Sequence, residues 1–250
     1  MRRRTEHRLP LRRLRTAGVT ATTPAAAVRL PKALATPNDD QALGLLASYF
    51  GHPDGTGDQF NGATFDGWDS TGTRADDADR FTADDLIAIG FLSVSVPATT
   101  ARTLLRDRAD ELAGLLAQVG PDRDLADEVD PVTPAWPAWQ LYNALDSILW
   151  IGRTTATKLL ARKRPRLLPV WDQHIGQVTG CTGEHWEPLR QALRTDERGL
   201  HRRLLRLRDT AGLPRAVSPL RVLDVICWLE GKAAAKPPQL HRRRLARRPL

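Results

Sequence analysis

The stretch IGRTTATKLLARKRPRLLPVWDQHI, residues 151–175, decides the fold expected for this chain of 250 residues. It opens next to Gly152, carries six Lys or Arg residues, and only then meets an acidic residue, Asp172. A glycine in a tight turn between two helices lets a phosphate approach the backbone N–H groups at the start of the second helix. The stretch therefore predicts a helix-hairpin-helix whose second helix begins at Arg153.

Basic side chains on and just after this second helix suggest a surface for DNA phosphates. Contacts to phosphates give affinity for DNA without reading its sequence. The simpler interpretation is a solvated basic surface, which is common on helices. The residues that we expect to contact DNA are Gly152, Arg153, Thr154, Thr155, Lys158, Arg162, Lys163, Arg164 and Arg166.

Helical patterns dominate the rest of the chain. Thr82 and Asp85 form a capping box before a buried apolar segment, and leucines recur at helical spacing in residues 99–119. Further amphipathic helices are predicted at 38–50, 138–149, 185–196, 199–212 and 218–231. Residues 51–80 are rich in Gly and Asp and suit a loop, with a short strand pairing near residues 63–68. We predict a mainly α bundle or barrel over residues 38–231, a disordered basic extension at 1–37 and a basic tail at 232–250.

Charge is distributed unevenly along the sequence. Residues 39–130 carry 19 acidic and 6 basic residues, whereas residues 131–240 carry 17 basic and 9 acidic ones. A polyanion should therefore be attracted to the second half. Two cysteines are too few for a disulfide scaffold or an iron–sulfur cluster, and they favour the cytoplasm. No membrane span, metal site or cofactor is expected.

The quoted stretch resembles the core of the helix-hairpin-helix DNA glycosylase superfamily, the endonuclease III-like enzymes. That family has the pattern L-P-G-V-G-R-x-T-A, followed about twenty residues later by V-D-T-H-I. Here IGRTTA is followed by PVWDQHI, and Asp172 lies 20 positions after Gly152. The segments LIAIGFLSVS and VLDVICWLEG resemble the first and last barrel helices, so the resemblance covers residues 81–231. It implies a catalytic role for Asp172, whereas an Asp before a helix is also a common N-cap.

Three residues depart from the family pattern. Trp150 replaces the first hairpin glycine, and Ser95 replaces a glutamine that fills the gap left by a flipped base. Thr154 stands at the position of the Schiff-base lysine, so the resemblance predicts no amine nucleophile. The segments YFGHP, RFTADDLIAI, ARKRPRLLPVWD and SPLRVLDV also look like an uncharacterised actinobacterial family, which brings no established activity.

Tryptophan is frequent near the quoted stretch and can stack on bases. Most of these residues have helical spacings that favour the core, and Trp150 and Trp171 are the two that flank the motif. The set is Trp136, Trp139, Trp150, Trp171, Trp186 and Trp228.

We therefore expect a cytoplasmic protein that binds the DNA backbone. The resemblance further implies a monofunctional DNA glycosylase of DNA repair, in which Asp172 supports cleavage and water is the nucleophile. One alternative is a DNA-binding module without catalysis. Another is a protein-interaction role for the acidic half, residues 39–130.

Overall fold

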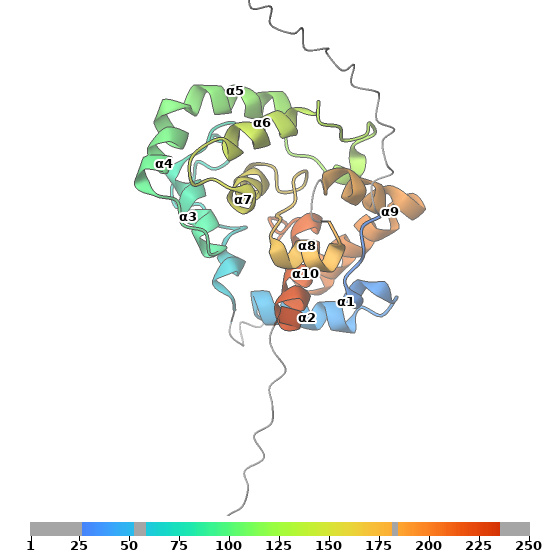
Figure 1. Cartoon of the computed structure of the whole chain (residues 1–250). Helices are drawn as coiled ribbons and strands as arrows, with labels where there is room; N and C mark the ends of the chain where they lie inside the picture. The colour runs from blue at the N-terminus through green and yellow to red at the C-terminus, as the bar shows by residue number, and fades with distance from the viewer. Residues whose placement is uncertain (1–26, 53–58, 182–184, 236–250) are drawn as a thin grey trace, which may run out of the picture.

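The computed structural model describes residues 27–52, 59–181 and 185–235, and these residues form ten α-helices and no strand. The mainly α class predicted from the sequence is confirmed. The helices form two groups, which we call the middle lobe and the terminal lobe (Figure 1). The middle lobe contains α3 (Ala83–Phe91), α4 (Ala98–Arg102), α5 (Ala109–Val119), α6 (Pro137–Asp146) and α7 (Arg153–Lys163). The terminal lobe contains α1 (Lys32–Ala35), α2 (Asp40–Phe50), α8 (Gln173–Thr179), α9 (Trp186–Thr210) and α10 (Pro219–Ala235).

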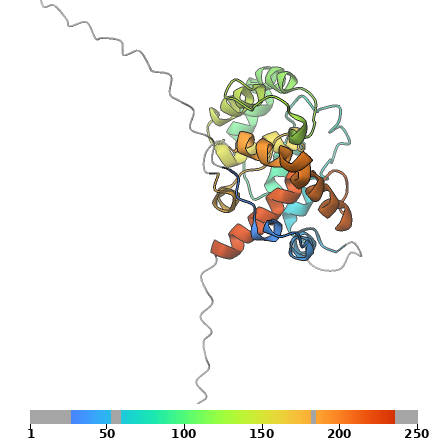
Figure 2. The same ribbon diagram turned by 90° about the vertical axis from the view of Figure 1, so that its right-hand side faces the viewer.

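The terminal lobe brings together the two ends of the described chain. Helix α10 packs against α8, α9 and α2, and Figure 2 shows α10 running beside α1 and α2. In the middle lobe α5 packs on α6, and α7 packs on both α3 and α6. One hydrophobic core runs through both lobes and includes Leu46, Ile89, Leu160 and Ile226. Because burial of apolar surface is the main stabilising contribution, the lobes form one folding unit.

Local sequence signals account for several helix boundaries. Thr82 and Asp85 form the predicted capping box at the start of α3, where the Asp85 carboxylate accepts the Thr82 backbone N–H at 2.8 Å. Gly152 is the N-cap of α7, which begins at Arg153 as predicted. Within α9 the backbone leaves helical geometry at Thr195–Arg198, so its two parts correspond to the two helices expected there.

Two predictions about local structure differ from what is observed. The segment around residues 63–68 forms a 3-10 helix, η1 (Asn61–Thr64), and no strand pairing. A π-helical segment, η2 (Thr103–Asp107), interrupts the helix predicted at 99–119. Such π segments insert an extra residue into a helical ladder, and the apolar spacing does not reveal them.

Residues 27–37, which the sequence assigns to the disordered extension, lie against the domain. The backbone N–H of Arg29 donates to the carbonyl of Thr179 at 2.9 Å. At the start of α1, the N–H groups of Lys32 and Ala33 both donate to the Glu230 carboxylate on α10 at 2.8 Å. The remainder of the predicted extension and residues 236–250 of the predicted tail lie outside the described residues.

Candidate functional site

A pocket of about 450 Å³ opens between the two lobes. Its walls come from both lobes, since α3 and α7 contribute from the middle lobe and α2, α8 and α10 from the terminal lobe. This volume lies within the range of small-molecule sites, which is roughly 300–1,000 Å³. The polar and charged residues that line the pocket are Tyr49, Asn61, Ser93, Thr154, Lys158, Asp172, Gln173, His174, Arg221, Asp224 and Lys232.

Asp172 stands at the edge of this pocket as the N-cap of α8. Its Oδ1 accepts the backbone N–H of Ile175 at 3.0 Å, so the capping role expected of an Asp at this position is confirmed. The same residue lines the pocket and is partly exposed. Capping therefore does not remove the carboxylate from the pocket. The role of Asp172 as an N-cap is compatible with the catalytic role that the resemblance implies.

The segment that leads into Asp172 is fixed on two sides. The Thr157 hydroxyl on α7 contacts both the backbone N–H and the carbonyl of Trp171, each at 3.2 Å. The N–H of Val170 donates to the Asp224 carboxylate on α10 at 3.0 Å. Burial raises the pKa of Asp224 well above its usual value. These contacts set the position of the Asp172 backbone relative to α7 and α10.

Helix α8 approaches α10 closely because Gly231 has no side chain. A β-carbon at residue 231 would lie 2.8 Å from both the Cβ and the backbone oxygen of His174. His174 also lines the pocket, and its Nδ1 is buried without a hydrogen-bond partner in the described structure. The close contact between the helices thus brings His174 and Asp172 beside the α10 side of the pocket.

Lys158 reaches the pocket from α7. Its side chain is buried, with only 6 % of the residue exposed, and Nζ donates to the carbonyl of Leu92 at 2.7 Å. Burial lowers the pKa of Lys158 to about 8, even though the Asp172 charge acts in the opposite direction. A lysine with this pKa is partly neutral near physiological pH.

Aromatic side chains form one wall of the pocket. Tyr49 stacks on Phe60 with ring centroids 5.3 Å apart, and Trp228 contacts both rings edge-on. The Lys232 ammonium lies over Trp228 and Phe60, at 4.5 and 4.8 Å from the ring centroids. Such a wall can stack against a planar ligand.

Arg221 holds this wall from inside the protein. It donates to the Asp66 carboxylate at 3.1 Å, to the Tyr49 hydroxyl at 2.7 Å and to the carbonyl of Gly62 at 3.1 Å. Arg221 and Asp66 are both buried, so the pair is shielded from competing water. The guanidinium thereby links α10 to α2 and η1 behind the pocket.

The basic run after Lys158 lies inside the protein and not on an open phosphate-binding surface. Arg162 and Lys163 share the buried Asp85 carboxylate at 3.1 and 2.6 Å, and Arg164 pairs with Asp79. The exposed fractions of Arg162, Lys163 and Arg164 are 2 %, 7 % and 1 %. Four residues predicted to contact DNA therefore bind partners inside the protein instead, namely Lys158, Arg162, Lys163 and Arg164.

Arg166 and the residues at the start of α7 are more accessible than this buried run. Arg166 retains 45 % of its side-chain exposure, but it makes a two-pronged ion pair with Asp124 at 2.8 and 2.7 Å. Gly152 is exposed, while Arg153, Thr154 and Thr155 are half-buried. The Arg153 guanidinium lies 3.6 Å from the centroid of the Trp171 ring. Gly152, Arg153, Thr154 and Thr155 are therefore the accessible residues of the predicted DNA-contact set at the start of α7, and Arg166 is accessible but paired with Asp124.

The tip of the turn before α7 presents two large apolar side chains. Leu149 and Trp150 are 75 % and 68 % exposed. Trp150 has φ +70°, which places it in the left-handed region that favours glycine. Trp150, which stands where the glycosylase pattern has a glycine, therefore has a backbone conformation typical of glycine. Ser95, at the position expected for the family glutamine, is exposed and does not line the pocket, whereas Ser93 does.

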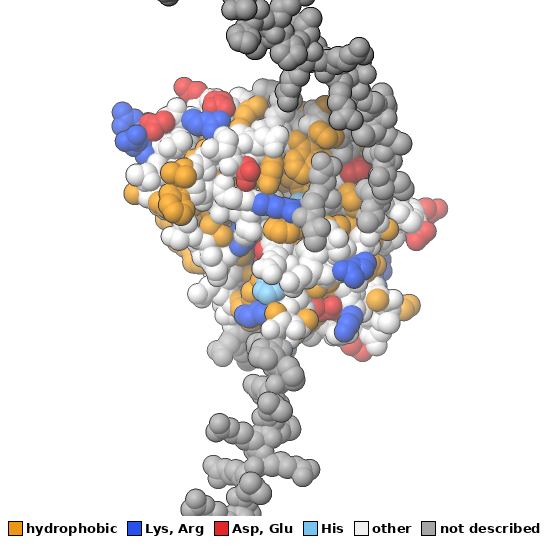
Figure 3. All heavy atoms as spheres, in the orientation of Figure 1, with side chains coloured by type: hydrophobic (Ala, Val, Ile, Leu, Met, Phe, Trp, Pro, Cys, Tyr) orange, Lys and Arg blue, Asp and Glu red, His pale blue; other side chains and the backbone are white. Residues whose placement is uncertain are grey.

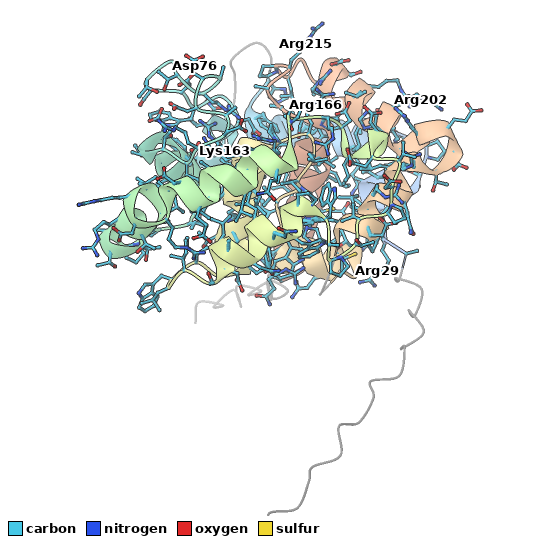
Figure 4. The ribbon with its side chains drawn as sticks, turned by 90° about the horizontal axis from the view of Figure 1, so that it is seen from above. Arg29, Asp76, Lys163, Arg166, Arg202 and Arg215 are labelled. Carbon is cyan, nitrogen blue, oxygen red and sulfur yellow. The ribbon has the colours of Figure 1, made fainter. Side chains whose placement is uncertain are left out.

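On the face drawn in Figure 3, basic side chains do not form a continuous surface. Figure 3 shows described Lys and Arg side chains scattered among apolar and acidic ones. In Figure 4, Arg202 and Arg215 project at the edge of the molecule, while Lys163 lies within it. Trp186 is fully buried, and Trp136, Trp139 and Trp228 pack against the core, in line with the expectation for most tryptophans.

Sequence reasoning missed the aromatic wall and the arginine behind it. Trp228 lies more than 160 positions after Tyr49 and Phe60, and nothing in the local sequence patterns predicts that the three rings meet. The sequence could have revealed Arg221 and Asp224, because charged residues within an apolar segment such as SPLRVLDVICWL are seldom buried without a partner. Within the described ranges, no group of three or more His, Cys, Asp or Glu residues could hold a metal ion.

Comparisons with known proteins identify a family but no activity. The model of DUF6308, a family of unknown function, matches residues 42–231. No curated protein and no solved structure gives a significant match. None of the helices in the described parts of the chain combines the length and apolar character needed to cross a membrane.

Proposed function

The chain belongs to the DUF6308 family, which has no known activity, and we therefore propose a function from the site itself. We propose that the pocket between the lobes receives a nucleobase from DNA and that Asp172 supports cleavage of its N-glycosidic bond. The protein would then be a monofunctional DNA glycosylase of DNA repair, with water as the nucleophile. The observation that carries the proposal is the placement of the Asp172 carboxylate beside a base-sized pocket with an aromatic wall.

The pocket suits a planar heterocycle. A base in duplex DNA must leave the stack before an enzyme can act on its glycosidic bond, and aromatic side chains can replace part of the lost stacking. Tyr49, Phe60 and Trp228 supply such contacts on one side. Asn61 and Ser93 add polar groups that can hydrogen-bond to base edges.

Asp172 matches the electrostatic demand of the reaction. As the bond between base and sugar breaks, positive charge develops on the sugar at C1′, and a fixed carboxylate stabilises that charge. The cap contact from Ile175 and the fixed Trp171 backbone limit movement of Asp172. A carboxylate held in place before the reaction requires little reorganisation during it.

The hairpin offers a route for the DNA backbone to the pocket. Gly152 is exposed at the start of α7, and Thr154, two residues further on, lines the pocket. Unbonded N–H groups in the first turn of a helix bind anions such as phosphate. We therefore restrict the proposed backbone contacts to Gly152, Arg153, Thr154 and Thr155.

Two other functions considered from the sequence receive less support. A DNA-binding module without catalysis has no need of a pocket beside Asp172, yet one is present. A protein-interaction surface made of the acidic half could use only part of its acids, because Asp66 and Asp85 are buried in ion pairs with Arg221 and Arg162. Asp124 likewise pairs with Arg166. Other acids of this half, such as Asp69, Asp76 and Asp110, are exposed.

Replacing Asp172 by Asn separates catalysis from capping. Asn is about as good an N-cap as Asp, so Asp172→Asn should change the free energy of unfolding by less than about 0.5 kcal/mol. Loss of the charge should reduce base release by about 10²–10³-fold. The assay measures free base and abasic sites after incubation with a panel of damaged-base duplexes.

The matched control is Asp146→Asn, which removes an exposed carboxylate at the end of α6. It should leave both stability and base release unchanged. Equal base release by the wild type and Asp172→Asn would refute the catalytic role of Asp172. Failure of the wild type to release a base from any duplex in the panel would refute the proposed activity.

A further inference from the structure

An amine occupies the pocket one helical turn beyond Thr154. Residues four apart lie on the same face of a helix, and both Thr154 and Lys158 on α7 line the pocket. The resemblance to the helix-hairpin-helix glycosylases puts that family's amine position at Thr154 and predicts no amine nucleophile in this chain. The structure therefore supplies, from a different residue, the kind of group that the motif lacks.

We propose that Lys158 is an amine nucleophile that condenses with an aldehyde carbon held in this pocket. For its natural substrate this inference rests on the proposed function, because release of a base leaves a deoxyribose that can open to an aldehyde. Water remains the nucleophile for base release, and the imine forms afterwards between Lys158 and the abasic sugar in the pocket.

The surroundings of Lys158 keep the amine inside the pocket. The Nζ–Leu92 carbonyl hydrogen bond fixes the end of the side chain at the C-terminal end of α3. Thr157, the preceding residue, holds the Trp171 backbone, so Lys158 and Asp172 lie on neighbouring segments. The titratable and charged groups that line the pocket around Lys158 are Tyr49 on α2, Asp172 and His174 at α8, and Arg221, Asp224 and Lys232 on α10.

The proposed step balances as a condensation. The neutral Nζ attacks the carbonyl carbon, a C–N bond forms, and the carbonyl oxygen takes up a proton. The resulting carbinolamine loses water when the nitrogen gives up its protons, and a C=N bond remains. Asp172 can accept a proton from the attacking nitrogen, because its carboxylate borders the same pocket. No oxidant, reductant or cofactor is needed.

Burial also favours the reactive form of the amine. With the pKa of Lys158 lowered to about 8, the neutral fraction rises about five-fold between pH 7 and 8 and less than two-fold between pH 8 and 9. An exposed lysine has a pKa near 10.4, so its neutral fraction rises nearly ten-fold over each of these intervals. The two kinds of lysine are therefore distinguishable by their pH profiles.

The test traps the imine by reduction. The full chain is incubated with glycolaldehyde and cyanoborohydride, and in parallel with a duplex that carries one chemically prepared abasic site. Modified lysines are then located by peptide mass spectrometry, which is simple because the sequence has five lysines. We expect Lys158 to be labelled at least ten-fold faster than the exposed Lys32 at pH 7.5, with the pH profile of a group that titrates near 8.

Variants connect the label to the residue. Lys158→Arg should abolish capture of the abasic duplex, and Lys32→Arg, which changes an exposed lysine outside the pocket, should retain it. Mapping on the wild type does not depend on how well Lys158→Arg folds. Labelling of Lys158 no faster than Lys32 would overturn the proposal. Labelling by glycolaldehyde without capture of the abasic duplex would support the nucleophile and count against the proposed DNA substrate.

Discussion

Asp85 holds two buried cations, and removing its charge tests the structural role of the basic run. Arg162 and Lys163 contact the carboxylate at 3.1 and 2.6 Å, and all three side chains are at most 3 % exposed. The substitution Asp85→Asn keeps the shape of the side chain and an oxygen that can accept the Thr82 N–H. It therefore removes the charge with little change in packing or capping.

The expected loss is large because both partners remain buried. Breaking a buried ion pair from one side costs about 3–5 kcal/mol, which is a substantial part of the 5–15 kcal/mol typical of a whole domain. The pKa of Lys163 is already lowered by burial, so this amine can lose its proton and moderate the loss. We therefore expect about 3 kcal/mol, equivalent to a fall in Tm of roughly 6–12 °C for a domain of this size.

Urea unfolding followed by circular dichroism measures the change. Asp76→Asn is the matched control, since Asp76 is exposed on the same acidic segment (Figure 4), and it should alter stability by less than about 0.5 kcal/mol. The effect of Asp85→Asn should persist at high salt, because buried pairs are weakly screened. A loss below about 1 kcal/mol would show that Asp85 does not stabilise the buried cations and would refute the reasoning.

Two further substitutions test the packing around the site. Gly231→Ala should lower the free energy of unfolding by about 1–3 kcal/mol and reduce base release, because the new β-carbon would lie 2.8 Å from His174. Gly90→Ala is the control: a β-carbon there has nothing within 4 Å, so the same unfolding assay should show a neutral or slightly stabilising effect. Equal effects of the two substitutions would contradict this account of α8 and α10. Trp150→Gly should raise the free energy of unfolding by roughly 1 kcal/mol, because glycine adopts the left-handed φ of residue 150 without strain. Trp150→Ala keeps a β-carbon and should not be stabilised, and thermal unfolding of the two variants measures the difference.

Local signals in the sequence predicted much of the fold. The Thr82–Asp85 capping box and the Gly152 turn each place a helix start within a few residues, and the structure has both. Such signals act between neighbours in the chain and need no knowledge of tertiary contacts. The π segment at Thr103–Asp107 has no comparable signal, and apolar spacing alone predicted a continuous helix there.

The candidate site was only partly predictable for the same reason. Asp172 was found from its interval to Gly152, but the aromatic wall depends on packing between segments more than 150 residues apart, such as Tyr49 and Trp228. The burial of Arg162 and Lys163 depends on Asp85, 77 positions before Arg162. Basic residues are seldom buried unless paired, and sequence patterns do not show which acid is the partner. From the uneven charge we predicted that the second half attracts a polyanion, whereas several of its cations pair with acids of the first half.

The long separation between ion-pair partners affects how the chain folds as it is made. Ribosomes add about 5–20 residues per second, so Asp85 is synthesised roughly 4–15 s before Arg162. The delay between the synthesis of Asp66 and that of its partner Arg221 is longer, because 155 positions separate them. During synthesis the acidic half therefore emerges without the cations that neutralise it. We infer that the terminal lobe is completed only after α10 has been made, because α2 packs against α10, whereas every helix of the middle lobe precedes residue 164.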